Sequence, residues 1–207
     1  KPHGCDPGAG SADYSDEDQR DGIGHDLRQG APFWLVLLAC PQGVDVGLLS
    51  EAGCPGVADP GAKLVQLAHQ RNIRVVPLVG PSSILLALMA SGLNGQCFAF
   101  QGYLPIEALR RVKIITELEK ESIIRGQTQI FIETPYRNQK LVELLVSVCQ
   151  PDTRLCVACN LTLRAEHIAT RTIEQWKDYT LDLNKKPCIF LLEGSADHKA
   201  SGYHNPP

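Results

Sequence analysis

Short apolar segments alternate with amphipathic segments along residues 45–194, and this alternation limits the fold more than any other feature of the chain. A short apolar run predicts a buried strand, whereas apolar residues three and four apart predict a helix with one buried face. We therefore expect strands over residues 45–50, 73–79, 96–105, 128–134, 153–161 and 187–194, and helices over residues 60–72, 81–92, 106–122 and 138–149. Strands that alternate with helices at this spacing are typical of a largely parallel sheet covered by helices.

The alternation is interrupted by a charged helical segment, which we take as a linker helix over residues 106–126. It separates an N-terminal α/β domain over residues 35–105, which holds the glycine-rich turns, from a C-terminal α/β domain over residues 127–194. Residues 1–34 are rich in Gly, Asp and Ser and contain few large apolar residues, so we expect irregular or disordered chain there. Residues 195–207 form a polar tail.

The chain is mildly acidic, with a formal net charge of -3. Such a chain has no general attraction to nucleic acid, so RNA binding requires a local basic patch. Arg110, Arg111 and Lys113 form a short basic cluster in the predicted linker helix. We expect this cluster to be a solvated helix face, with contact to an RNA backbone as the alternative.

The sequence contains eight cysteines, and most of them lie inside apolar runs. Cys156 and Cys159 have C-x-x-C spacing, but residues i and i+3 of a strand point to opposite faces. We therefore expect no metal site. Neither a signal peptide nor an apolar run of membrane-spanning length is evident. These features predict a cytoplasmic chain with reduced thiols and no membrane segment.

Residues 48–64, LLSEAGCPGVADPGAKL, place three glycines and two prolines between a predicted strand and a predicted helix. Turns of this kind expose backbone amides at the carboxyl ends of strands, where α/β proteins bind ligands. Glycine lets a ligand approach the backbone closely. Asp59, directly before Pro60, is placed to cap the helix that follows. The alternative is a tight turn that binds nothing.

A second turn of the same kind lies in residues 76–92, VPLVGPSSILLALMASG. Its Ser82 and Ser83 either line a crevice shared with the first turn or cap the helix that follows. The sequence contains neither the dinucleotide fingerprint G-x-G-x-x-G nor the P-loop pattern. The two turns therefore suit a nucleoside-type ligand better than a polyphosphate.

Four segments, in this order, resemble the tetrapyrrole methylase superfamily, and within it most of all the branch that contains ribosomal RNA small subunit methyltransferase I. They are LLSEAGCPGVADPGAKL, IRVVPLVGPSSILLALMASGL, FAFQGYLP and IFIETPYRNQKLVELL. The resemblance implies an S-adenosylmethionine-dependent methyltransferase with two α/β lobes, the cofactor in the cleft between them, no metal, and a homodimeric state. The acceptor that it implies is RNA, at a ribose 2′-hydroxyl of ribosomal RNA.

The resemblance also implies which residues bind the cofactor, and they come from both predicted lobes. They are Ser50, Ala52, Gly53, Cys54, Pro55, Val57, Ser82, Ser83, Glu133, Asn160, Leu161, Thr162, Pro187 and Cys188. Glu51 and Glu133 are the candidate carboxylate bases for an acceptor hydroxyl, and each has the alternative of a solvated or capping carboxylate. Arg137 is the third candidate catalytic residue, with the cofactor carboxylate, Glu133 or a phosphate as its partner.

The chain departs from the family pattern in two places that bear on the substrate. The first strand of the family and the loop after it are not recognisable in residues 1–44, so we expect that strand to be missing or divergent. Where the branch has R-E-x-T-K, this chain has CNLTL at residues 159–163. Two alternatives therefore stand beside RNA methylation: C-methylation of a tetrapyrrole, and cofactor binding without turnover.

Overall fold

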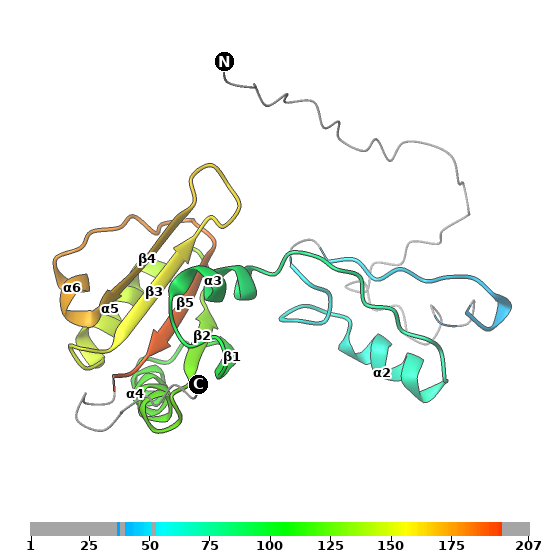
Figure 1. Cartoon of the computed structure of the whole chain (residues 1–207), viewed down its shortest axis with the longest axis horizontal. Helices are drawn as coiled ribbons and strands as arrows, with labels where there is room; N and C mark the ends of the chain where they lie inside the picture. The colour runs from blue at the N-terminus through cyan, green and yellow to red at the C-terminus, as the bar shows by residue number, and fades with distance from the viewer. Residues whose placement is uncertain (1–36, 38–39, 51–52, 196–207) are drawn as a thin grey trace, which may run out of the picture. The chain divides into compact units, whose positions relative to one another are not determined.

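The computed structural model describes residue 37, residues 40–50 and residues 53–195 (Figure 1). The chain divides into two compact units. The first comprises Lys1–Gly47 and Gly61–Val75, and the second comprises Leu48–Pro60 and Val76–Pro207. The predicted irregular segment over residues 1–34 and the tail from residue 196 onwards lie outside the described residues.

The first unit contains a short 3-10 helix, η2 (Cys40–Gln42), and the helix α2 (Ala62–Gln70). The prediction of a helix at this place is confirmed. One side of α2 is buried through Leu64 and Ala68, which are spaced four residues apart as an amphipathic helix requires. The helix ends where Asn72 adopts a left-handed conformation, with φ 55°, and the N–H of Ile73 donates to the carbonyl of Ala68 at 2.9 Å.

The described residues of the second unit form a five-stranded sheet with the order β1-β2-β5-β3-β4. Its strands are β1 (Phe98–Tyr103), β2 (Thr128–Ile132), β3 (Arg154–Cys159), β4 (His167–Thr172) and β5 (Cys188–Glu193). Four of these strands lie in segments predicted to be strands. The prediction of a largely parallel sheet is wrong, because only β1 and β2 pair in parallel; β5 runs antiparallel to both of its neighbours and β4 runs antiparallel to β3.

Helices cover both faces of this sheet (Figure 1). They are α3 (Ser83–Ser91) on one face, and α4 (Ala108–Arg125), α5 (Asn138–Val148) and α6 (Ile173–Lys177) on the other. Alternate residues of β3 enter the two cores: Cys156 packs on the face of α3, and Cys159 packs on the opposite face. The prediction that these two cysteines point to opposite faces is therefore confirmed.

The helix α4, predicted as a linker, packs against β2, β5 and α5. Its buried residues, Arg111, Ile115, Glu119 and Ser122, follow one another at intervals of three and four residues. The interpretation of Arg111 as part of a solvated basic face is wrong, because its side chain is 8% exposed and pairs with Glu133. The boundary between two lobes at residues 106–126 stays a prediction.

Two segments predicted as strands, residues 45–50 and 73–79, have no regular secondary structure. A strand exists only where its backbone pairs in a ladder, and neither segment is paired within the described residues. Leu49, Leu78 and Val79 are therefore exposed although they are apolar. No described helix is long and apolar enough to cross a membrane.

Candidate functional site

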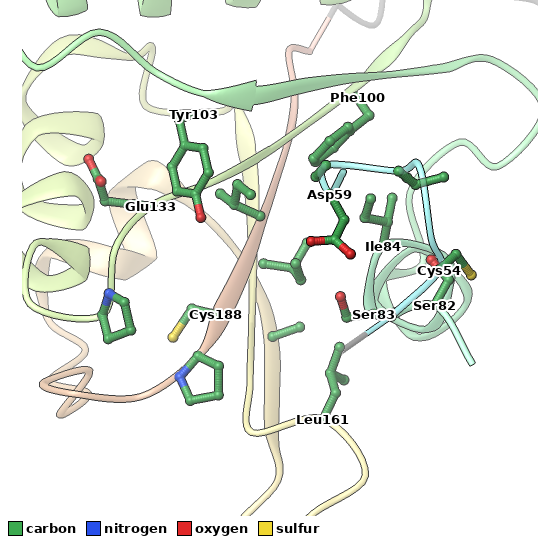
Figure 2. Close-up of a pocket in the computed structure, with 18 residues that line it drawn as sticks. Cys54, Asp59, Ser82, Ser83, Ile84, Phe100, Tyr103, Glu133, Leu161 and Cys188 are labelled. Atoms are coloured by element: carbon green, nitrogen blue, oxygen red, sulfur yellow. The ribbon is translucent and has the colours of Figure 1, made fainter. Parts of the chain in front are cut away.

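A cavity of about 390 Å³ opens in the second unit, at the end of the sheet where β1, β2 and β3 finish and β5 begins (Figure 2). Pockets of roughly 300–1,000 Å³ commonly hold small molecules. The lining residues come from the glycine-rich turn, the start of α3 and four strands. They are Gly53, Cys54, Val57, Ala58, Asp59, Ser82, Ser83, Ile84, Phe100, Tyr103, Ile132, Glu133, Pro135, Ala158, Leu161, Pro187, Cys188 and Ile189.

The glycine-rich turn forms the wall that carries Asp59. Gly53 and Gly56 have φ values of 77° and 76°, which residues with a Cβ rarely adopt. The thiol of Cys54 donates to the carbonyl of Pro81 at 3.7 Å, and this contact holds the two predicted turns together. The expectation that both turns contribute to one crevice is therefore met by the geometry of the cavity.

Asp59 does not cap α2, so that prediction is wrong. The residue before the helix is Gly61, whose φ of 136° turns the chain before the first helical residue, and the structure shows no side-chain cap there. The carboxylate of Asp59 instead points into the cavity beside Ser83 (Figure 2). No ion pair to Asp59 occurs within the part of the chain that the structure describes.

Ser82 is the N-cap residue of α3, but its side chain makes no capping hydrogen bond. Its backbone carbonyl accepts the first helical bond, from the N–H of Leu86 at 2.9 Å. Both Ser82 and Ser83 line the cavity. Both residues therefore border the cavity, and the Ser82 hydroxyl does not cap the helix.

Phe100 and Tyr103 reach the same cavity because β1 contains a bulge. In a regular strand, residues three apart point to opposite faces. The register with β2 shifts between Phe100 and Tyr103, and Gly102 within this bulge has a φ of 67°. The extra residue turns the strand, so that both aromatic side chains face the ligand space (Figure 2).

Glu133 follows β2 and is held by two arginines. Its Oε2 accepts a hydrogen bond from Arg111 at 2.8 Å, and its Oε1 accepts from Arg137 at 2.8 Å and from the N–H of Thr134 at 2.7 Å. Its side chain is 1% exposed. Of the three partners considered for Arg137, the structure shows Glu133. Figure 2 shows Glu133 at the edge of the cavity, with its carboxylate turned away from Asp59.

The opposite wall comes from the end of β3 and the start of β5. The N–H of Asn160 donates to the carbonyl of Pro187 at 3.0 Å, which fixes the two segments against each other. Leu161, Pro187 and Cys188 present small and apolar groups to the cavity. Asn160 has a φ of 51°, so the chain turns sharply directly after β3.

The cavity has a largely apolar lining and one carboxylate, that of Asp59, without an ion pair among the described residues. The other lining carboxylate, Glu133, is paired with Arg111 and Arg137, and the described lining residues include neither Lys nor Arg. Such a cavity disfavours a polyphosphate and suits a ligand with an uncharged ring and a positive centre. No cluster of three or more metal-ligating side chains occurs within the described ranges.

The cavity brings together nine of the predicted site residues: Gly53, Cys54, Val57, Ser82, Ser83, Glu133, Leu161, Pro187 and Cys188. It does not include Ser50, Pro55, Arg137, Asn160 or Thr162, although Arg137 contacts Glu133. Glu51 and Ala52 lie outside the described residues. Sequence reasoning did not place Asp59, Phe100 and Tyr103 in the cavity lining. The glycine within the FAFQGY strand was the available signal for the last two.

A comparison with models of known protein families identifies the family of this chain. The model of the Tetrapyrrole (Corrin/Porphyrin) Methylases matches residues 12–177. The chain belongs to this family. The resemblance drawn from the four sequence segments is therefore confirmed.

Two curated relatives of this chain carry the same name. The ribosomal RNA small subunit methyltransferase I of Mesorhizobium japonicum is 34% identical over 177 residues, which cover 85% of this chain and 59% of that protein. The enzyme of the same name from Vibrio cholerae is 36% identical over 176 residues, or 84% of this chain and 60% of that protein. The chain thus spans about three fifths of the length of these relatives.

Solved structures give a weaker likeness. The crystal structure of the methyltransferase CobJ aligns with a TM-score of 0.46 at 20% sequence identity, covering 70% of this chain and 62% of that one. At this score the likeness supports no statement about the site.

Proposed function

We propose that the chain binds S-adenosylmethionine in the cavity of the second unit and belongs to a methyltransferase that acts on ribosomal RNA. The observation that carries this proposal is the cavity itself, which joins the glycine-rich turn, the start of α3 and four strand ends. The names of the curated relatives support ribosomal RNA as the acceptor.

The residues present fit this cofactor. The hydroxyls of Ser82 and Ser83 and the backbone at Gly53 would hold the polar groups of the cofactor, and Leu161 and Ile189 offer apolar contact to an adenine ring. A Cβ added at Gly53 would meet no atom within 4 Å, so the space beside its backbone is open. When bound, S-adenosylmethionine supplies a methyl group that its sulfonium already activates.

The chain's own contribution to the reaction is alignment and charge. A displacement reaction needs the donor and the acceptor held in line, and the cavity walls provide fixed positions for the donor. A ribose hydroxyl must also lose a proton during attack. Both oxygens of Glu133 are hydrogen-bonded to arginines, which favours a positioning role for Glu133. Asp59 is the lining carboxylate without such partners, and we propose it as the proton acceptor, with Glu51 as the alternative.

The proposal of a homodimer rests on the family resemblance and on exposed apolar residues. Phe98, Tyr103, Ile106 and Leu109, on β1, the segment after it and the start of α4, are exposed by 40–81%. Large exposed apolar patches commonly mark an interface. Light scattering coupled to size-exclusion chromatography tests the state directly, and a mass of one chain across the micromolar range would contradict the dimer.

Titration calorimetry with S-adenosylmethionine tests the pocket, with Gly53→Val as the variant and Gly95→Val as the matched control. Gly53 has a positive φ and lines the cavity, whereas Gly95 lies outside the cavity, has no positive φ and also has open space for a Cβ. We expect one-site binding that Gly53→Val weakens at least tenfold and Gly95→Val leaves unchanged. Absence of binding by a chain that circular dichroism shows to be folded would contradict the proposal.

The acceptor needs a separate assay with the labelled methyl donor. Small ribosomal subunits that lack this methylation and a uroporphyrinogen-type tetrapyrrole are offered in parallel. Label in the ribosomal RNA supports the proposal. Label in the tetrapyrrole would contradict ribosomal RNA as the acceptor and indicate a tetrapyrrole methyltransferase. Cofactor binding without methyl transfer to either acceptor would favour a cofactor-binding protein without turnover.

A further inference from the structure

The side chains of Cys159 and Cys188 meet beside the cavity, which Cys188 lines and Cys159 does not. Cys159 ends β3, Cys188 begins β5, and the two residues are register partners in the antiparallel ladder. The next pair of the ladder, Asn160 and Pro187, is hydrogen-bonded, because the N–H of Asn160 donates to the carbonyl of Pro187. Cys159 and Cys188 are therefore a non-hydrogen-bonded pair, in which Cα atoms lie about 4.5 Å apart and side chains approach most closely.

The two sulfur atoms lie 2.9 Å apart, and either can donate a hydrogen bond to the other. A disulfide requires Cα atoms about 4.4–6.8 Å apart and an S–S distance near 2.05 Å. The backbone spacing of this strand pair already falls in that range. The sulfurs need to approach by only about 0.9 Å, the difference between 2.9 Å and about 2.05 Å.

Access and acidity distinguish this pair from the other buried cysteines. Cys188 lines the cavity, so the pair lies next to the space that a small oxidant enters, although Cys188 itself is only 5% exposed. The hydrogen bond from Cys188 lowers the pKa of the Cys159 thiol; burial opposes this shift and Lys186 adds to it. Cys156, by contrast, faces the other side of the sheet, and burial raises the pKa of its thiol. The hydrogen bond with Cys159 and burial raise the pKa of the Cys188 thiol. The thiolate is the reactive form of cysteine, so Cys159 is the more readily ionised thiol of the pair, and Cys188 is the one that borders the cavity.

We propose that Cys159 and Cys188 form a reversible disulfide in the cavity wall when a hydroperoxide enters the cavity. Hydrogen peroxide oxidises one thiol of the pair to a sulfenic acid and releases one water. The sulfur of the other cysteine then attacks the oxidised sulfur, the S–S bond forms, and the oxygen leaves in a second water. Two thiols and one peroxide thus give one disulfide and two waters, and a dithiol reductant restores both thiols.

The bond changes the wall of the ligand site. The bond draws the Cys188 sulfur towards β3 and away from the cavity. Cys188 stands in the chain between Pro187 and Ile189, which also line the cavity. We expect the oxidised chain to bind the cavity ligand more weakly. This consequence rests on the proposed function, whereas formation of the bond does not.

Peptide mapping of the peroxide-treated full chain tests the bond. Trypsin leaves Cys156 and Cys159 together in residues 155–164, and it leaves Cys188 in residues 186–199 because Pro187 blocks the cut after Lys186. We expect these two peptides to be cross-linked after digestion without reduction. The cross-link should persist in a Cys156→Ala chain and disappear in Cys159→Ala.

The peptide map of the native chain shows whether the disulfide forms, even if a variant folds poorly. Recovery of both peptides with free thiols, or with separately over-oxidised cysteines, would overturn the proposal. A cross-link that survives in a folded Cys159→Ala chain would also overturn it, because Cys156 would then be the partner.

Titration with S-adenosylhomocysteine before oxidation, after oxidation and after reduction tests the effect on the cavity. We expect affinity to fall at least fivefold on oxidation and to recover with dithiothreitol. Equal affinity in a fully cross-linked chain would overturn the effect on the cavity. Failure of the reduced chain to bind would count against the proposed function, while the peptide map would still decide whether the bond forms.

Discussion

The guanidinium of Arg111 on α4 donates a hydrogen bond to the carboxylate of Glu133 at the end of β2, across 2.8 Å. Arg137 approaches the other carboxylate oxygen at 2.8 Å from the start of α5. One buried carboxylate thus joins two helices to the strand end that borders the cavity. Arg111 also donates to the carbonyl of Pro105, which ties the segment after β1 into the same cluster.

Replacing Arg111 should cost the fold far more than replacing an exposed arginine or lysine. Arg111→Ala leaves the buried carboxylate of Glu133 with one of its two cationic partners, and breaking such a pair costs roughly 3 kcal/mol or more. We expect urea unfolding to show a loss of about this size. The matched control is Lys113→Ala, which removes an exposed i,i+4 pair with Glu117 and should cost about 0–1 kcal/mol. Equal losses in the two variants would contradict a stabilising role for the buried cluster.

The secondary structure was largely predictable from the sequence, but the order and direction of the strands were not. Run length and periodicity are local properties, and they located β2, β3, β5 and α5 correctly. Pairing depends on where distant segments meet: β5 inserts between β2 and β3 and runs antiparallel to both. The chain reaches β5 through an irregular segment after α6 rather than through a crossover helix, and the sequence pattern does not reveal that difference.

The sequence pattern located the two turns that line the cavity, and it failed where tertiary contacts decide. Gly53 and Ser82 line the cavity because each lies in a local turn that the glycine, proline and serine pattern marks. Arg111 was misread because a run of charged residues usually faces solvent, whereas here the i+4 stripe from Arg111 through Ile115 to Glu119 is buried. Asp59 was misread because the turn at Gly61 separates it from the helix.

Stability should fall at alkaline pH because of Cys149. Burial and the neighbouring Glu119 raise the pKa of this thiol above its usual range. The folded chain then keeps a proton that the unfolded chain releases near pH 8.5, so the stabilising contribution is complete below that pH and declines as pH rises. We expect a loss of about 2 kcal/mol in the free energy of unfolding by about pH 10.

The contribution of Cys149 is isolated by comparing the native chain with Cys149→Ala in urea unfolding across this pH range. Other groups titrate equally in both chains, so the difference between them reports this thiol. The difference should shrink as pH rises. A constant difference would show that the folded thiol ionises as readily as the unfolded one.

The start of α6 should depend on Thr172. Its hydroxyl accepts a hydrogen bond from the N–H of Gln175 at 3.2 Å, and the Gln175 side chain accepts from the N–H of Thr172 at 3.0 Å. This reciprocal pair is a capping box, and its loss costs about 1 kcal/mol. We expect Thr172→Ala to lower the free energy of unfolding by this amount and Thr172→Ser to keep most of it. A serine variant as unstable as the alanine variant would assign the loss to the methyl group instead.

The charge of Asp59 should distinguish two forms of the proposed cofactor. S-adenosylmethionine carries a positive sulfonium, whereas S-adenosylhomocysteine has a neutral sulfur at the same place. A carboxylate in a partly wet cavity attracts a nearby cation by on the order of 1–2 kcal/mol, which corresponds to about tenfold in affinity. Asp59→Asn should therefore weaken S-adenosylmethionine about tenfold and S-adenosylhomocysteine much less, as measured by titration calorimetry. Asp152→Asn, an exposed site outside the cavity, should change neither affinity. An equal loss for both ligands would mean that Asp59 shapes the turn and does not act through its charge on the sulfonium.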